Sequence, residues 1–387
     1  MSRPLRTVPA GAEHHTNLLA ALRRALAGDG PAVRASGDLQ TQRHGDSHLQ
    51  PLDVPDDVAL VVETSGSTGE PRAVMLSAAS LRASAAATDA RLGGPGQWLL
   101  TLPPTHIAGL QVLVRSVLTG TVPVVASPGG FRPGSFAADA ARLTAPRRYV
   151  SLVPTQLHRL LDTDAGLTAL TTFDAVLLGG AAAGPALLAR AVAAGVAVTT
   201  TYGMSETCGG CVYDGAPLGG VRIRLDDEGR VLIAGPVLAS GYLGRPDLDA
   251  EAFDHSDGVR WLHTSDVGEL SGGLLTVLGR LDDMLVTGGA KVSPAAVERL
   301  VAELPGVGEV CVVGVPDAEW GQAVTAVVVL AAGHDGPTLT SLRSHVTRNL
   351  GAPAAPRHLV VIDRLPVRGP GKTDRRAVAD LAAARLT

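Results

Sequence analysis

Two lysines stand out as candidates for chemistry that depends on a positive charge. The 387-residue chain holds 33 lysines and arginines, of which only Lys291 and Lys372 are lysines, so 33 − 2 leaves 31 arginines. An ammonium is a compact charge on a flexible stem, whereas a guanidinium is a planar fork. Codon bias would explain scarce lysine, but both lysines lie in glycine-containing, charge-punctuated segments. This placement favours a functional role for both.

A second candidate is the segment Thr64-Ser-Gly-Ser-Thr-Gly-Glu-Pro-Arg72, which we expect to follow a strand and precede a helix. Glycines let backbone N–H groups approach a phosphate closely, and hydroxyls add donors. The segment does not fit the GxxxxGK[ST] pattern of a P-loop. The preceding strand and the following cation disfavour a flexible linker. We therefore predict a phosphate-binding loop of another kind, formed by Thr64, Ser65, Gly66, Ser67, Thr68, Gly69 and Arg72.

The elements that must position these segments form two units. A helix over residues 16–27 is expected first, then a polar loop with His44, Asp46 and His48. Apolar runs and Ala/Leu-rich patterns then alternate, which predicts an α/β domain with a largely parallel sheet. The expected strands are residues 58–62, 98–102, 122–126, 149–153, 175–178 and 196–200, and the expected helices are 77–90, 109–118, 154–161 and 185–194.

The pattern changes after about residue 215. Short strands at 221–225, 230–234 and 274–278, separated by Gly and Asp turns, predict a small antiparallel region or barrel. An α+β module of roughly one hundred residues follows and is large enough to fold as a unit. It would contain helices at 294–303 and 340–349 and strands at 310–315, 323–330 and 358–362. We place the boundary at residues 279–283, giving domains 1–279 and 280–387.

Composition excludes several classes of protein. The net charge is −4, and no basic face suited to nucleic acid is evident. No apolar run approaches the ~20 residues that span a bilayer, and the N-terminal segment lacks the apolar core of a signal peptide. Three cysteines are too few for a disulfide framework, which fits a reducing cytoplasm. Cys208-Gly-Gly-Cys211 is a single pair, for which we expect neither a metal nor a redox role.

Further motifs follow the loop in order: Leu102-Pro-Pro-Thr-His106, Leu178-Gly-Gly-Ala-Ala182, Thr201-Tyr-Gly-Met-Ser-Glu-Thr207, Trp261-Leu-His-Thr-Ser-Asp266, Gly279-Arg-Leu-Asp-Asp283, Gly288-Gly-Ala-Lys291 and Gly371-Lys372. The ordered set, spanning residues 64–372, resembles the AMP-forming acyl/aryl-CoA ligases, the adenylate-forming superfamily. Arg72 and Ala73 stand where that family usually has Lys and Gly. The resemblance implies a large N-terminal domain of layered α/β subdomains with a small antiparallel β region, followed by a small mobile α+β domain.

The resemblance also implies ATP, Mg²⁺ and CoA as ligands, and a role for each motif. Lys372 would complete the adenylation site, Glu206 would hold Mg²⁺, and Asp282 would be the hinge. Lys291 would approach the site in the thioester-forming state. Asp266, with Arg280 alongside, would hold the ribose, and Tyr202 would stack on adenine. The acyl pocket would include His106, Gln156, Gly179 and Gly180, and the remaining nucleotide contacts would be Gly180, Ala181, Thr201, Gly203 and Ser205.

The residue chemistry agrees with these roles. Adenylation joins a carboxylate to the α-phosphate of ATP, so two anions must meet and cations at the developing charge are essential. Mg²⁺ is a hard ion that favours carboxylate and phosphate oxygens, which suits Glu206. Alternatives remain for single residues, because Asp266 could be a turn residue, Tyr202 a core tyrosine and His106 a satisfied core histidine.

The substrate is predicted from a narrower resemblance. The chain is compact, with only some sixty residues before the phosphate loop, and carries the segments SLVPTQLHRLL and LLGGAA. These features resemble the o-succinylbenzoate–CoA ligases of menaquinone biosynthesis. The alternatives are another aryl- or fatty-acyl-CoA ligase, a free-standing adenylation domain that loads a carrier protein, and a non-catalytic nucleotide-binding relative. The joint presence of Glu206, Asp266, Arg280 and Lys372 disfavours the last.

Overall fold

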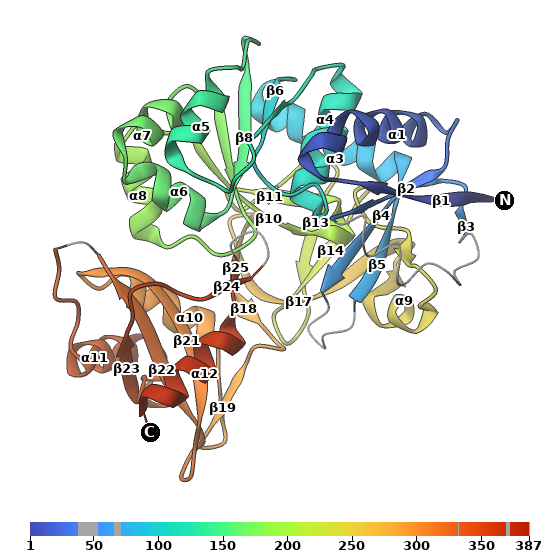
Figure 1. Ribbon diagram of the computed structural model, residues 1–387. Coiled ribbons are helices and arrows are strands. Elements are labelled where there is room, and N and C mark those ends of the chain that lie inside the picture. The colour runs from blue at the N-terminus through green and yellow to red at the C-terminus, as the bar shows by residue number, and fades with distance from the viewer. Residues whose placement is uncertain (38–52, 66–70, 332, 369–371, 387) are drawn as a thin grey trace.

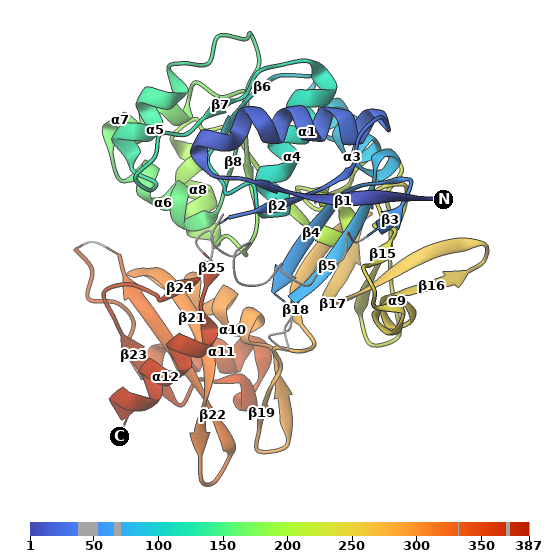
Figure 2. The same cartoon turned by 45° about the vertical axis from the view of Figure 1, so that its right-hand side comes forward.

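The computed structural model describes residues 1–37, 53–65, 71–331, 333–368 and 372–386. Gly66, Ser67, Thr68 and Gly69 of the phosphate loop lie outside the described residues, as do His44, Asp46 and His48 of the expected polar loop. Figures 1 and 2 show a larger body that carries the N-terminus and a smaller body, drawn in orange and red, that carries the C-terminus. No helix in the described ranges has the length and apolar character needed to cross a bilayer.

A seven-stranded sheet lies at the centre of the larger body. Its strand order is β12-β11-β10-β9-β8-β6-β7, and the pairs from β10 to β7 are parallel, as the alternating pattern predicted. Its strands are β6 (Gln97–Leu100), β7 (Val124–Val125), β8 (Arg148–Leu152), β9 (Ala175–Leu178), β10 (Val198–Met204), β11 (Gly209–Tyr213) and β12 (Ala216–Pro217). The associated helices are α4 (Ile107–Thr119), α5 (Pro133–Ala140), α6 (Pro154–Leu161), α7 (Asp164–Leu170) and α8 (Pro185–Ala193).

A second sheet has six strands in the order β15-β5-β4-β2-β1-β3 and was only partly foreseen. It comprises β1 (Ser2–Pro9), β2 (Ala32–Ser36), β3 (Asp53–Pro55), β4 (Val58–Ser65), β5 (Pro71–Ser77) and β15 (Gly241–Tyr242). Nearby lie η1 (Ala12–His14), α1 (His15–Ala27) and α3 (Ala78–Leu92).

The setting of the phosphate loop differs from the one expected. The loop joins two antiparallel strands, β4 and β5, with Thr64 opposite Arg72, instead of leading directly into a helix. The segment after the loop forms a strand because its backbone pairs with β4 on one side and β15 on the other, and its Val74 and Leu76 side chains are fully buried in the core. Helix α3 begins only at Ala78, where the Ser77 hydroxyl accepts a bond from the Ser80 N–H.

The predicted antiparallel region is confirmed and larger than expected. It comprises β13 (Arg222–Leu225), β14 (Arg230–Ala234), β16 (Phe253–Ser256), β17 (Val259–Ser271) and β18 (Leu274–Arg280), and all of its pairs are antiparallel. Helix α9 (Pro246–Ala252) precedes β16. The sequence did not reveal β16 because it is short and three of its four residues are polar, of which Asp254 and His255 are exposed.

The smaller body has its own sheet, in the order β21-β22-β23, with apolar clusters that include Val312 and Val324 in one and Val313 and Val327 in the other. Its elements are β19 (Leu285–Thr287), β20 (Ala290–Val292), α10 (Pro294–Ala302), β21 (Val307–Asp317), β22 (Gly321–Leu330), α11 (Leu339–Leu350), η3 (Ala352–Ala354), β23 (His358–Val361), β24 (Val367–Arg368), β25 (Lys372–Thr373) and α12 (Arg375–Leu386). The predicted fold class is therefore confirmed. The boundary at residues 279–283 stays a prediction.

Candidate active site

Two predicted site segments, residues 178–182 and residues 201–207, meet at the ends of two neighbouring parallel strands. Thr200 of β10 pairs with Leu178 of β9, and the Thr201 hydroxyl donates to the Leu178 carbonyl at 3.3 Å. Gly179 follows directly, and a Cβ there would overlap the Thr201 hydroxyl. The carboxyl edge of a parallel sheet is where α/β proteins bind ligands. Only a residue without a side chain fits at the position of Gly179.

Gly203 has an equally direct reason to be glycine. The pairing of β10 with the antiparallel strand β11 shifts register between Tyr202 and Gly203. The shift brings the Gly209 carbonyl against Gly203, so a Cβ at this position would overlap the carbonyl oxygen. The chain then turns through the single-turn helix η2 (Ser205–Thr207), which carries the buried Ser205 and the half-buried Glu206.

Tyr202 and Asp266 form the first of two tyrosine–carboxylate pairs. The Tyr202 hydroxyl donates to Asp266 Oδ2 at 2.7 Å, joining β10 to β17. The Asp266 side chain is only 11% exposed. Burial raises the pKa of Asp266 above its ordinary value, although the bond from Tyr202 and the charge of Arg280 oppose the rise. A buried carboxylate with remaining acceptor capacity suits a pair of ribose hydroxyls.

Arg280 lies opposite Asp266 in the pairing of β17 with β18. Its Nη1 is 3.9 Å from Asp266 Oδ1, while its Nε and Nη2 donate to the two oxygens of Asp282 at 2.8 and 2.6 Å. The paired hydrogen bonds to Asp282 raise the pKa of Arg280 above its usual value. The predicted hinge residue is therefore bound to the cation beside the predicted ribose carboxylate.

Glu206 and Tyr242 form the second pair. The Tyr242 hydroxyl donates to Glu206 Oε1 at 2.8 Å, and the Glu206 carbonyl accepts from the Ala239 N–H at 2.8 Å. Tyr242 lies on β15, which pairs with β5 next to Arg72. Burial and then Glu206 raise the pKa of Tyr242, and the Arg72 guanidinium opposes them. Thr64, Arg72 and Glu206 therefore converge at one end of the β4–β5 hairpin.

The residues around Glu206 fit Mg²⁺ as an ion shared with a phosphate ligand. In the part of the chain that the structure describes, no group of three or more His, Cys, Asp or Glu side chains is placed to hold a metal. Mg²⁺ is commonly held by one or two carboxylates together with substrate phosphates and waters, so a single half-buried carboxylate is sufficient. Tyr242 engages one oxygen of that carboxylate.

Tyr242 belongs to no motif of the sequence, although one feature of the composition points to it. The chain contains only four tyrosines, and two of them, Tyr202 and Tyr242, donate to carboxylates of the candidate site. Tyrosine is nearly as scarce as lysine in this chain, so the argument from scarcity that selects the lysines selects the tyrosines as well.

The other two predicted pocket residues lie at the starts of helices, Gln156 in the first turn of α6 and His106 just before α4. Gln156 is buried, and its amide oxygen accepts the Val153 N–H at 3.1 Å, so this oxygen caps helix α6. His106 is exposed at the start of α4, where its side chain makes no capping bond. Gly180 and Ala181 are exposed beyond β9.

The two lysines lie at opposite ends of the smaller body. In Figures 1 and 2, the β24–β25 hairpin, which carries the Lys372 backbone, faces the larger body. The β19–β20 hairpin points away from it, and Lys291 on that hairpin is exposed. The hairpin that carries Lys372 therefore lies on the side of the smaller body that faces the larger one, and the hairpin that carries Lys291 lies on the opposite side.

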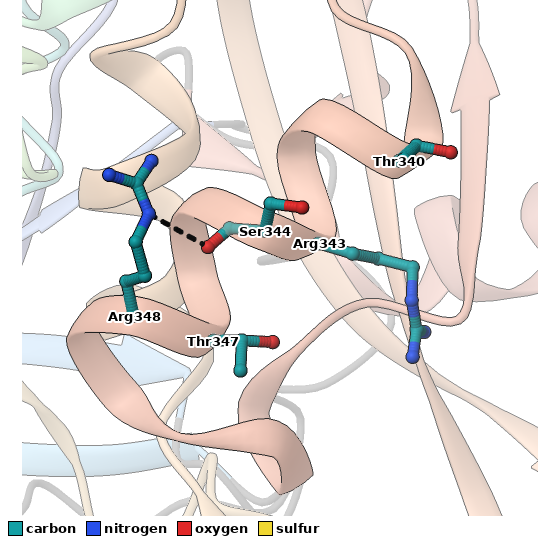
Figure 3. A pocket seen from close by; sticks show the side chains of 5 residues that line it. All are labelled: Thr340, Arg343, Ser344, Thr347 and Arg348. Atoms are coloured by element: carbon teal, nitrogen blue, oxygen red, sulfur yellow. Dashed lines mark hydrogen bonds between the residues drawn. The ribbon is translucent and has the colours of Figure 1, made fainter.

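A hollow on helix α11 has no part in this arrangement. It is lined by Thr340, Arg343, Ser344, Thr347 and Arg348, all from one helix of the smaller body (Figure 3). Arg343 donates to the Pro356 carbonyl and Arg348 to the Ser344 carbonyl, so both cations are engaged locally. None of the predicted site residues lies on this helix.

Comparison with known proteins agrees with this geometry. The model of the AMP-binding enzymes matches residues 10–243, and that of the AMP-binding enzyme C-terminal domain matches residues 296–372. The chain is 48% identical over 381 residues, 96% of each chain, to a probable 2-succinylbenzoate–CoA ligase of Mycobacterium tuberculosis. It is 35% identical to the medium/long-chain-fatty-acid–CoA ligase FadD8 of the same organism, over 84% of this chain and 61% of the relative.

A solved structure has the same fold. It is the o-succinylbenzoate CoA synthetase of Bacillus subtilis in complex with the acyl-adenylate intermediate, at a TM-score of 0.72 and 24% identity, covering 97% of this chain and 87% of that one. The resemblance predicted from the ordered motifs is confirmed. The chain belongs to the family of AMP-binding enzymes.

Proposed function

We propose that this protein is an AMP-forming acid–CoA ligase whose acid is 2-succinylbenzoate. The observation that carries the choice of acid is the 48% identity, over 96% of both chains, to a relative with that name. Two tyrosine–carboxylate pairs in the larger body and a lysine hairpin that faces this body support the ligase chemistry. The product would serve menaquinone biosynthesis, as the sequence resemblance implied. A cytoplasmic location stays a prediction.

In the first half-reaction, a carboxylate oxygen of the acid attacks the α-phosphorus of ATP, and the bond to the β-phosphate breaks to release pyrophosphate. Asp266 would accept the ribose hydroxyls, with the Tyr202 ring beside the adenine. The β4–β5 loop and Arg72 would hold the departing phosphates. Lys372 would neutralise charge that develops between the two anions, the largest kind of contribution to such a barrier. Mg²⁺, held by Glu206 and the phosphates, would supply further neutralisation.

In the second half-reaction, the CoA thiol loses its proton and its sulfur attacks the acyl carbon, and the bond from that carbon to the phosphate oxygen breaks to release AMP. Lys372 would have to withdraw, because its hairpin lies between the smaller and the larger body. Rotation about Asp282 would then bring the Lys291 hairpin toward the site. Such hinge motion concentrates the backbone change in a few residues.

The test is CoA-dependent AMP release with ATP and Mg²⁺, comparing 2-succinylbenzoate, simple benzoates and medium-chain fatty acids. We expect a strong preference for 2-succinylbenzoate. If only other acids are turned over, the choice of 2-succinylbenzoate as the substrate is wrong, and the ligase mechanism still stands.

A fatty-acyl-CoA ligase is the second candidate, because the chain is 35% identical to a relative named for medium- and long-chain fatty acids. Preference for those acids in the same assay would favour it. A third result would be pyrophosphate exchange without CoA-dependent AMP release, which would point to a carrier protein as the acceptor.

A further inference from the structure

Arg375 lies three residues after Lys372, at the first position of helix α12, and its guanidinium is held on several sides. Nη1 donates to the Val312 carbonyl at 2.9 Å, and Nη2 donates to Glu298 Oε2 at 2.8 Å. Nη1 is also 2.7 Å from Glu298 Oε1, so the fork meets the carboxylate with both of its arms. Paired contacts of this kind fix orientation as well as distance.

Glu298 is itself held in place by the backbone. It lies on α10, its side chain is 16% exposed, and its Oε1 also accepts the Val312 N–H at 2.7 Å. Burial would lower the pKa of Arg375, but the Glu298 carboxylate above all raises it, so the guanidinium stays charged. Arg375 therefore joins α12 to α10 and to β21, and α12 lies against β21 (Figure 1).

The chain between Arg375 and Lys372 has little slack. Thr373 pairs with Val367 in the β24–β25 hairpin, and the Asp374 N–H donates to the Pro366 carbonyl at 2.9 Å. Asp374 also caps α12, since its Oδ1 accepts the Ala377 N–H at 3.2 Å. Three residues of extended chain span at most about 10 Å. The place where Arg375 is anchored thus limits where the Lys372 backbone can be.

We propose that Arg375, through its pair with Glu298, is a positioning residue that holds the backbone of Lys372 in the place needed for adenylation. The proposal rests on the proposed function and on the role given there to Lys372. Both members of the pair belong to the smaller body, so the pair moves with it. Its effect is confined to the half-reaction that uses Lys372.

Arg375 is also close to the predicted hinge. Its Nε is 3.9 Å from Asp283 Oδ2, and both side chains are more than a third exposed. A contact at this distance between partly exposed groups contributes little, so the Glu298 pair carries the positioning. Substitution of Arg375 is therefore expected to act on the lysine hairpin and not on the hinge.

The test compares Arg375→Gln, Arg375→Lys and Glu298→Gln with the wild-type chain, and uses Arg376→Gln as the matched control because Arg376 is the exposed neighbour. Two activities are measured: ATP–pyrophosphate exchange driven by 2-succinylbenzoate, and CoA thioester formation from supplied acyl-adenylate. Thermal unfolding is followed in parallel.

We expect Arg375→Gln to lower kcat of the exchange by about 10- to 100-fold, because small displacements of a catalytic group have effects of this size. The KM for ATP should not change, since the nucleotide contacts lie in the larger body. The rate of thioester formation from supplied acyl-adenylate should also not change. The kcat of exchange in Arg375→Lys should lie between those of the wild type and Arg375→Gln, because lysine keeps the positive charge but lacks the planar fork of the guanidinium. Arg376→Gln should match the wild type.

Equal losses in both half-reactions would overturn the proposal and leave Arg375 a structural residue, and wild-type exchange in Arg375→Gln would overturn it as well. If Arg375→Gln does not fold, Arg375→Lys and Glu298→Gln decide by the same comparison. Failure of the proposed function is separate, because then the wild-type chain itself shows no acid-dependent exchange. Wild-type exchange in Lys372→Ala would refute the assignment of Lys372.

Discussion

Replacing Tyr202 by phenylalanine separates two roles of one side chain. The aromatic ring stays available for stacking on adenine, while the hydroxyl that donates to Asp266 Oδ2 at 2.7 Å is lost. Asp266 is 8% exposed, so little water can replace the missing donor. We expect the variant to fold, to bind ATP more weakly and to respond differently to pH.

The size of the effect follows from this one bond. A hydrogen bond to a charged group contributes about 1.5–3 kcal/mol, and because Tyr202 is itself partly exposed we expect the lower end. About 1.4 kcal/mol corresponds to a tenfold change in an equilibrium constant, so the KM for ATP should rise by about tenfold. The same loss of ~1.5 kcal/mol should lower Tm by about 2–3 °C in a domain of this size.

The pH dependence has a definite sign. Burial raises the pKa of Asp266 above its unfolded value, so its contribution to stability is fully present below that value and is lost as pH rises through the folded pKa. The bond from Tyr202 lowers the pKa and limits this loss. In Tyr202→Phe the folded pKa is higher, so the stability gap to the wild type should widen as pH increases. The acid limb of kcat/KM for ATP should move to higher pH, because the ribose hydroxyls need the ionised carboxylate.

The assay is acid-dependent ATP–pyrophosphate exchange across pH, with thermal unfolding at the same pH values. Tyr213→Phe is the matched control. Tyr213 is buried on β11, the strand next to β10, and its hydroxyl is 3.2 Å from the Thr88 hydroxyl of helix α3. The control should lose about 0.5–1.5 kcal/mol of stability with no change in the KM for ATP. An unshifted acid limb in Tyr202→Phe would refute the reasoning, as would the same rise in KM in both variants.

Three further substitutions test other parts of the site. Lys372→Ala should lower pyrophosphate exchange by about 100-fold or more while thioester formation from supplied acyl-adenylate continues, and equal loss of both would contradict the two-state assignment. Tyr242→Phe should raise the Mg²⁺ concentration for half-maximal exchange by about tenfold, because Glu206 loses the donor that orients it; an unchanged Mg²⁺ titration would argue against this site. Gly179→Ala should raise the KM for the acid and cost about 1–3 kcal/mol of stability, because the new methyl overlaps the Thr201 hydroxyl; unaltered acid kinetics would remove Gly179 from the pocket.

The parts of the fold that sequence predicted well are those with strong local patterns. Strands β8, β9 and β10 are buried runs flanked by helical segments, and their parallel pairing follows from the alternation. Strand β5 was missed because Val74, Met75 and Leu76 form a short apolar run just before a helix. Pairing with β4 and β15, which is distant in sequence, makes it a strand.

The same distinction applies to the candidate site. Glycines such as Gly179 and Gly203 occur in recognisable motifs, and the structure supplies the steric reason for each. Tyr242 reaches Glu206 across 36 residues of sequence, and no spacing rule reports such a contact. The pairing of Arg375 with Glu298 spans 77 residues and likewise cannot be predicted from sequence spacing. Motifs identify the groups that meet ligands, while the groups that orient them become visible only in three dimensions.

The placement of the two lysines bears on how the chain would work. Lys372 lies on the hairpin that faces the larger body, and Lys291 lies on the hairpin at the opposite end of the same smaller body. A rigid unit cannot present both ends to one site at the same time. If both lysines serve the site, as their scarcity suggested, the smaller body must turn between two half-reactions. In the sequence, residues 280–283 lie between the core residues of the larger body and those of the smaller body. Asp282 is bound there to Arg280, whose guanidinium is 3.9 Å from Asp266. The turn would therefore begin beside the carboxylate that we assign to the nucleotide.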